Sequence, residues 1–288
     1  MKLDNVLAGY IPETRGRDGL ALATLLTGQA HAHLTVAIVQ PPARSTPGPA
    51  RAEQSEWRAY LKEQAEATLT QARELAGPDA DYWIHTHRGS GRGLVELARK
   101  RDADVVVIGS ASGGGRGRIA VGSTADQLLH SSSVPVLLAP RGYGDKPPAA
   151  FDRLTVAYRR GPGCDVALKD AAAVAVRLGL PLRLVTLVIR KTRRAKIEEE
   201  MLVRLREQAA ADLRAAAQDH SKRLKVEVEL LEGRNVAQAL GTTSWLPGEM
   251  IICASSDTGP LRRVFLGDTS LKIVRASTCP VMILTRQS

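Results

Sequence analysis

The chain is poor in aromatic residues and in cysteine, and it has no long apolar run. Aromatic residues make up 3% of the 288 residues, so a core has to be built mainly from aliphatic side chains. The three cysteines, Cys164, Cys253 and Cys279, form no Cys-x-x-Cys pair and cannot all pair within one chain. This usage favours a reducing compartment and buried thiols. No apolar stretch is long enough to span a membrane, and the N-terminus lacks a signal-peptide pattern, so we expect a cytoplasmic protein.

Common catalytic and metal-binding motifs are also missing. The sequence contains no G-x-x-x-x-G-K-[ST] phosphate loop and no G-x-S-x-G nucleophile elbow. Its six histidines are scattered and are not accompanied by a metal-binding cysteine motif. No paired acid and base emerges from the spacing of titratable residues. We therefore expect neither a catalytic site nor a metal site, and hence no enzyme.

The charge is uneven along the chain, whose formal net charge is +10. Residues 1–150 carry 17 Lys or Arg and 15 Asp or Glu, about +2, whereas residues 151–288 carry 23 and 15, about +8. A basic half of this kind could attract nucleic acid. The chain lacks the interleaved aromatic residues, helix-turn-helix pattern or zinc motif of common nucleic-acid binders. A nucleic-acid partner is therefore the least favoured of the hypotheses considered below.

What the sequence does contain is an internal repeat. The stretch at 105–138 returns at 250–283 with the same spacing, because Gly109, Gly122 and Pro135 each have a counterpart 145 residues later. Near the start of each copy the spacing is 148 residues, from Tyr10 to Tyr158. A repeat of domain size predicts two copies of one fold. We assign an N-terminal domain to 1–140, a Gly/Pro-rich linker to 141–150 and a C-terminal domain to 151–288.

Apolar patterning predicts alternating strands and helices in each copy. Alternation of this kind is typical of a doubly wound α/β fold with a parallel sheet. The run at 105–108 is entirely apolar and mostly β-branched, which suits a central strand covered on both faces. Expected strands are 5–9, 34–39, 82–87, 105–108, 135–138, 154–158, 182–188, 226–231, 250–253 and 279–284. Expected helices include 20–26, 94–99, 124–130, 166–178, 197–218 and 236–240. A further long helix is expected to end near residue 75, and a turn is expected at 89–93, before the helix at 94–99.

A glycine-rich loop follows the fourth expected strand. Gly109 ends that strand, and residues 113–115 and 117 are further glycines. Gly122-Ser123-Thr124 then opens a helix, where free backbone N–H groups and hydroxyls form an anion site. Arg116 and Arg118 could add charge. The alternative is that the loop is only flexible and the Gly-Ser-Thr only a helix cap.

The spacing of Gly109, Ser112, Gly122 and Ser123 resembles the G-x2-G-x9-G-[ST] motif of universal stress proteins. The first strand (VLAGY) and the ending SVPVLL are similar to that family too, and the likeness extends over essentially the whole chain as a tandem form. The resemblance implies two flavodoxin- or Rossmann-like domains, each with a five-stranded parallel sheet in the order 3-2-1-4-5. It also implies adenine-nucleotide binding in many members and dimerisation through the last strand.

By that resemblance, the N-terminal copy would hold ATP, with Mg, or another adenine ligand such as cyclic AMP. The residues carried over to this pocket are Gly9, Tyr10, Ile11, Val39, Ile108, Gly109, Ala111, Ser112, Gly122, Ser123 and Thr124. The last strands, at 134–139 and 279–284, would face each other in an intramolecular pseudo-dimer. A further homodimer and an unidentified protein partner are compatible with this arrangement, and slow ATP hydrolysis is conceivable for such a family.

The chain departs from the family pattern at several positions. Ile11 stands where the family usually has an acid that recognises the ribose or the base, and Ser112 replaces the second glycine of the motif. In the C-terminal copy, Ala254 and Asp257 replace the first two glycines and Asp268 replaces the hydroxyl, so we expect this copy not to bind ATP. The favoured hypothesis is a stress-response regulator that senses an adenine nucleotide. The competing hypothesis is a degenerate scaffold that binds no nucleotide and acts through protein contacts.

Overall fold

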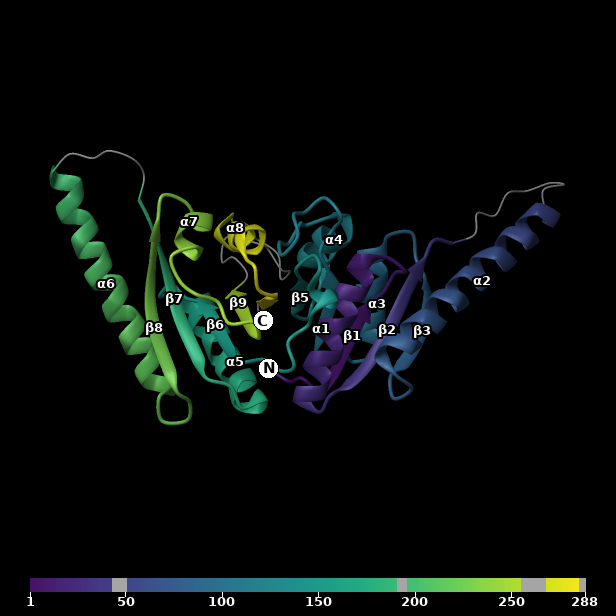
Figure 1. The fold of residues 1–288 in the computed structure, drawn as a ribbon, viewed down its shortest axis with the longest axis horizontal. Coiled ribbons are helices and arrows are strands. Elements are labelled where there is room, and N and C mark those ends of the chain that lie inside the picture. The colour runs from purple at the N-terminus through teal and green to yellow at the C-terminus, as the bar shows by residue number, and fades with distance from the viewer. Residues whose placement is uncertain (43–50, 191–195, 255–267, 285–288) are drawn as a thin grey trace.

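The computed structural model describes residues 1–42, 51–190, 196–254 and 268–284. Its strands form one ten-stranded sheet that runs along the molecule (Figure 1). The strands of the first half are β1 (Asn5–Gly9), β2 (His33–Gln40), β3 (Asp81–Thr86), β4 (Val105–Gly109) and β5 (Val136–Ala139). Those of the second half are β6 (Arg153–Ala157), β7 (Leu182–Ile189), β8 (Val226–Gly233), β9 (Glu249–Ala254) and β10 (Val281–Leu284).

The strand order is β3-β2-β1-β4-β5-β10-β9-β6-β7-β8. Each half is a parallel sheet with the order 3-2-1-4-5, which confirms the predicted fold class. The two halves meet where β5 and β10 pair antiparallel, with Met282 opposite Leu137 and Ile283 opposite Val136. The last strands of the two copies therefore lie side by side, as the sequence predicts, and neither remains an open edge.

Helices cover both faces of the sheet. Apolar side chains of α1, α2, α5 and α6 pack into the core on one face, and those of α3, α4, α7 and α8 pack on the other. Within the described parts of the chain, none of these helices combines the length and apolar character that a membrane crossing requires. Their bounds are α1 (Thr14–Ala30), α2 (Arg51–Ala76), α3 (Ser90–Lys100), α4 (Ser123–Ser131), α5 (Pro162–Leu178), α6 (Lys196–His220), α7 (Val236–Leu240) and α8 (Asp268–Ala276).

The largest differences from the sequence prediction are at helix starts, and α5 begins at Pro162 instead of Val166. The turn expected at 89–93 is wrong, because α3 begins at Ser90 and contains Gly91 and Gly93. A Cβ atom at Gly91 would lie 2.6 Å from the Thr124 carbonyl oxygen, and one at Gly93 would lie 2.6 Å from the Val39 side chain. These glycines therefore allow α3 to pack closely, rather than forming a turn. Likewise, α1 begins six residues before the predicted segment at 20–26, at Thr14.

The segment assigned as a linker is anchored to the first half. It contains a short 3-10 helix, η1 (Tyr143–Asp145). The carboxylate of Asp18, which is 1% exposed, accepts hydrogen bonds from the backbone N–H groups of Gly142 and Gly144, each at 2.8 Å. A buried carboxylate needs such partners, because an unpaired buried charge is strongly unfavourable. The connection between the copies is therefore a packed element rather than a free tether.

Candidate functional site

A cavity of about 180 Å³ lies beyond the carboxyl ends of β1, β2 and β4. This is the edge of a doubly wound sheet at which ligands usually bind, next to the point where the strand order reverses. The structure brings nine of the eleven predicted residues together here: Gly9, Ile11, Val39, Ile108, Gly109, Ala111, Gly122, Ser123 and Thr124. Residues that sequence reasoning did not select complete the lining: Arg15, Gly16, Ala37, Ser90, Leu94 and Ala125. We call this the nucleotide cavity, after the ligand that the family resemblance predicts for it.

The other two predicted residues, Tyr10 and Ser112, lie outside the nucleotide cavity. They line a neighbouring cavity of about 660 Å³ that α1, α2 and Arg141 help to form. Tyr10 packs into the core on the α1 face of the sheet, because successive side chains along a strand point to opposite faces. Burial raises the pKa of the Tyr10 phenol, and the nearby Arg17 opposes part of that rise.

Glycines of the motif are required by packing around the cavity. A Cβ atom at Gly109 would lie 1.9 Å from the Arg15 carbonyl oxygen, so this glycine lets the start of α1 lie over the end of β4. A Cβ atom at Gly122 would lie 2.8 Å from that of Ala111. Part of the glycine motif thus serves the fold itself, and close approach of a ligand is not needed to explain it.

The start of α4 forms the polar end of the nucleotide cavity. Gly122 is the N-cap and no side chain caps the helix, so the first backbone N–H groups remain available to an anion. The hydroxyl of Thr124 is already engaged, because it lies 2.6 Å from the Ser90 hydroxyl. Ser123 is exposed and lines the cavity. The arrangement therefore offers backbone donors and one hydroxyl to a phosphate group.

The glycine loop between β4 and α4 is held by its own contacts. Ser110 is 1% exposed, and its hydroxyl accepts a hydrogen bond from the Ala120 N–H at 2.8 Å. The Arg141 guanidinium donates to the Gly114 carbonyl at 2.7 Å. Arg116 forms an ion pair with Asp145 at 2.7 Å, so this arginine, which could have faced a phosphate, is occupied elsewhere. Contacts with Arg141 and Asp145 thus hold the loop against the segment that follows β5.

Charge near the cavity comes mainly from Arg15, whose Nε lies 3.0 Å from a Glu13 carboxylate oxygen. Ile11 keeps the end of β1 apolar where the family pattern has an acid. Nearby on β3, His85 lies 3.1 Å from Glu96. The hydrogen bond with His85 lowers the pKa of Glu96. Neither His85 nor Glu96 lines the nucleotide cavity.

The corresponding edge of the second half is described only in part. Asp257 lies outside the described residues, as do the arginines at 262 and 263. Ala254 ends β9, and Asp268 is the first residue of α8, where α4 has Ser123. Asp268 forms an ion pair with Lys272 one helical turn later. A carboxylate at this position opposes an anionic ligand, in contrast to the hydroxyl of the first copy.

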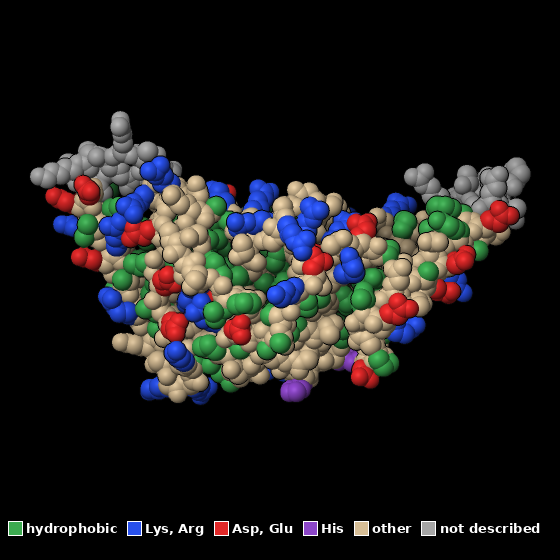
Figure 2. Space-filling view, in the orientation of Figure 1, with side chains coloured by type: hydrophobic (Ala, Val, Ile, Leu, Met, Phe, Trp, Pro, Cys, Tyr) green, Lys and Arg blue, Asp and Glu red, His purple; other side chains and the backbone are tan. Residues whose placement is uncertain are grey.

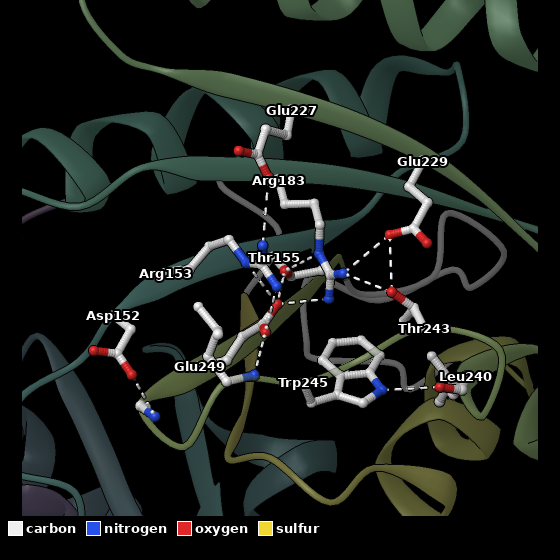
Figure 3. Close-up of polar contacts among 12 residues, drawn as sticks. Asp152, Arg153, Thr155, Arg183, Glu227, Glu229, Leu240, Thr243, Trp245 and Glu249 are labelled. Atoms are coloured by element: carbon white, nitrogen blue, oxygen red, sulfur yellow. Dashed lines mark hydrogen bonds and ion pairs between the residues drawn. The ribbon is translucent and has the colours of Figure 1, made fainter.

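A polar network fills the opposite edge of the second half, at the amino ends of its strands (Figure 3). Glu249 is fully buried and its two oxygens lie 2.6 Å from Arg183 and 2.9 Å from Arg153. Arg183 also contacts Glu229 at 3.0 Å and lies 4.6 Å from the centre of the Trp245 ring. Every charge in this cluster has partners, so the network has a structural explanation. Sequence reasoning missed it, because its members come from four separate strands and a loop.

Comparisons with known proteins match both halves. The model of the Universal stress protein family matches residues 7–140 and 150–285. Universal stress protein Rv2319c of Mycobacterium tuberculosis is 31% identical over 295 residues, covering 97% of this chain and 99% of that protein. A solved universal stress protein from Archaeoglobus fulgidus has a TM-score of 0.64 at 19% identity, covering 100% and 98%. A functionally unknown protein, PA1789, from Pseudomonas aeruginosa has a TM-score of 0.60 at 13% identity, covering 98% and 92%.

Proposed function

Because the chain belongs to the universal stress protein family, we propose that it is a regulator that binds an adenine nucleotide in its N-terminal half. One observation carries this proposal: nine residues carried over from the family resemblance line a single cavity beyond the carboxyl ends of β1 and β4. The fold brings these residues together because β1, β2 and β4 are adjacent parallel strands, and their carboxyl ends form the edge at which a doubly wound sheet usually binds its ligand. The adenine ligand is ATP in this proposal, with ADP, AMP and cyclic AMP as comparison ligands.

The chemistry of the lining fits the two ends of a nucleotide. Val39, Leu94 and Ile108 provide an apolar surface for a base, as is usual for cofactor cavities. Gly122 and Ser123 start the helix whose N–H groups face the phosphate end. Ile11 offers no carboxylate to the ribose. Binding in this proposal therefore depends on apolar contact and backbone donors.

We propose binding rather than catalysis. The residues described around the nucleotide cavity include no Asp, Glu, His, Cys or Lys, so the lining has no group with the ordinary chemistry of a general base. Arg15, the Ser123 hydroxyl and the backbone N–H groups at the start of α4 can bind and orient phosphate oxygens. A bound nucleotide, with or without Mg, would then act by ordering the cavity and the surface around it.

Isothermal titration of the full chain with ATP tests the proposal. The variant Ser123→Asp places a carboxylate at the phosphate end, and we expect it to weaken ATP binding about tenfold or more, since a like charge at about 4 Å costs roughly 1–4 kcal/mol. Asp is favourable in the first turn of a helix, so α4 should remain intact. Ser133→Asp is the matched control, because Ser133 is exposed and lies outside the nucleotide cavity. Unchanged affinity in Ser123→Asp would remove the site assignment.

The scaffold hypothesis has one observation in its favour. The nucleotide cavity, at about 180 Å³, is smaller than the roughly 300–1,000 Å³ usual for small-molecule sites. Native mass spectrometry of the purified protein separates the two hypotheses. A mass increment that matches a nucleotide supports sensing. A bare chain that also shows no heat on titration with millimolar ATP supports a scaffold that acts through protein contacts.

A further inference from the structure

A third cavity, of about 410 Å³, lies at the junction of the two halves between α4 and α8. We call it the junction cavity. Its first-half lining is Val121, Gly122, Ser123, Asp126, Leu129 and His130, and its second-half lining is Leu271 and Arg275. Figure 2 shows several Lys and Arg side chains near the middle of the visible face, where Figure 1 places α4 and α8.

The junction cavity adjoins the nucleotide cavity at the start of α4, because Gly122 and Ser123 line both. At about 180 Å³ the nucleotide cavity cannot enclose a complete nucleoside triphosphate. A base and ribose held there, with phosphates at the start of α4, would direct the remaining phosphates past Ser123. The space on that side is the junction cavity.

Arg275 is the arginine that lines the junction cavity, on the side toward which the remaining phosphates would extend. It lies in the last turn of α8 and is exposed. No acidic side chain in the described part of the chain lies within ion-pair distance of Arg275. Asp126 lines the same cavity, and its carboxylate lies 3.4 Å from His130 Nδ1 rather than in an ion pair with Arg275. The cavity therefore holds one arginine whose charge is not matched by a described carboxylate.

The position of Arg275 beside the first half is fixed by a neighbouring contact. The Arg118 guanidinium, from the glycine loop, donates to the carbonyl of Ala276, which follows Arg275 directly. The same loop is held to Arg141, whose carbonyl accepts from the Gly117 N–H at 2.8 Å. The end of α8 and the glycine loop are thus joined across the junction, so Arg275 does not need a domain rearrangement to reach the phosphate side.

We propose that Arg275 binds the terminal phosphates of a nucleoside polyphosphate held in the nucleotide cavity, so that the second half completes the site of the first. This inference rests on the proposed function and adds that the site binds a triphosphate more tightly than a monophosphate or a cyclic nucleotide. A triphosphate spans both cavities, whereas a monophosphate or a cyclic nucleotide ends at the start of α4. The second half then contributes to nucleotide binding although the start of its own corresponding helix carries Asp268.

Titration of the full chain with ATP and with AMP tests this inference. We expect Arg275→Gln to weaken ATP binding about tenfold or more, the range for loss of a charge-assisted hydrogen bond, and to leave AMP binding within twofold. Arg275→Lys should retain part of the ATP affinity. Lys272→Gln is the matched control, because it removes a cation from the same helix but lies outside the junction cavity. It should leave both affinities unchanged.

The outcomes distinguish the inference from the proposed function. If the wild-type chain binds ATP and Arg275→Gln binds it equally well, the inference is overturned and the proposed function stands. Equal losses for ATP and AMP would also overturn the inference, because they indicate a structural effect on the whole site. If the wild-type chain binds neither ligand, both the proposed function and the inference are wrong.

Discussion

At the scale of single residues, the glycines at the end of β4 and in the loop after it have two different roles. Gly109 is needed because the carbonyl of Arg15 occupies the place where a side chain would begin. A Cβ atom at Gly113, in the same loop, would meet nothing within 4 Å, so this glycine has no packing role. A motif read along the sequence cannot separate these cases, because the contact comes from the start of α1, which is far from Gly109 in the chain.

This difference predicts the effect of two alanine substitutions. Gly109→Ala should lower the free energy of unfolding by about 1–3 kcal/mol or more, since the clash is with backbone and overpacking of a tight site is costly. Gly113→Ala is the control and should change stability by less than about 0.5 kcal/mol. Urea denaturation followed by circular dichroism measures both values. Equal stability of the two variants would show that α1 does not pack on β4 as described.

At the scale of elements, the amino ends of the second-half strands differ in kind from those of the first half. Arg153, Thr155 and Arg183 lie in the second half where the first half has Asn5, Leu7 and Thr35, with the repeat spacing of 148. Parallel strands bring these side chains together with Glu249 because their registers align Arg153 with Glu249 and Thr155 with Arg183. The two copies therefore share a strand order but differ in the side chains at the amino ends of their strands.

The network predicts a large effect for one buried carboxylate. Glu249→Gln leaves two arginines without their main buried counter-charge, and removal of one partner from such a pair costs about 3–5 kcal/mol. Glu227→Gln is the matched control: its side chain is 44% exposed and pairs with Arg153 at 3.3 Å. An exposed pair contributes about 0–1 kcal/mol. Denaturant unfolding of both variants measures the contrast, and similar small losses would contradict a buried network.

At the scale of the whole molecule, the two halves form one structure. The cluster of buried side chains on each face of the sheet contains residues of both copies, with Leu137 and Met282 in one and Leu138 and Val281 in the other. The β5–β10 ladder lies at the centre of both clusters. The halves therefore share their apolar burial, which is the main stabilising term in folding.

Shared burial predicts that the two halves unfold together. Differential scanning calorimetry of the full chain should show one transition with equal calorimetric and van't Hoff enthalpies. Met282→Asp places a charge in the middle of the junction, so we expect a loss of roughly 3 kcal/mol or more or a split into two transitions. Met201→Asp, at an exposed site on α6, should behave like the wild type. Two separate transitions in the wild-type chain would show that the halves are independent.

The amino-acid sequence predicts some features of the fold and of the candidate site and not others. The repeat and the alternation of strands and helices followed from spacing and apolar patterning, whereas the strand order 3-2-1-4-5 was implied by the family resemblance. Nine of the residues carried over by that resemblance come together in one cavity, while Tyr10 and Ser112 lie in another. Their ligand-binding role stays a prediction. The start of α3 was predicted wrongly because its glycines serve close packing and resemble a turn in sequence.

The amino-acid sequence alone established the alternation of strands and helices and the two-copy arrangement, because apolar periodicity and repeat spacing can be read along the chain. The folded structure was needed to show that Gly109 accommodates α1, that Glu249 pairs with two arginines, and that Arg275 shares a cavity with the start of α4. These contacts join positions that are far apart in the chain. Their partners depend on strand register and on the pairing of β5 with β10, which no local pattern encodes.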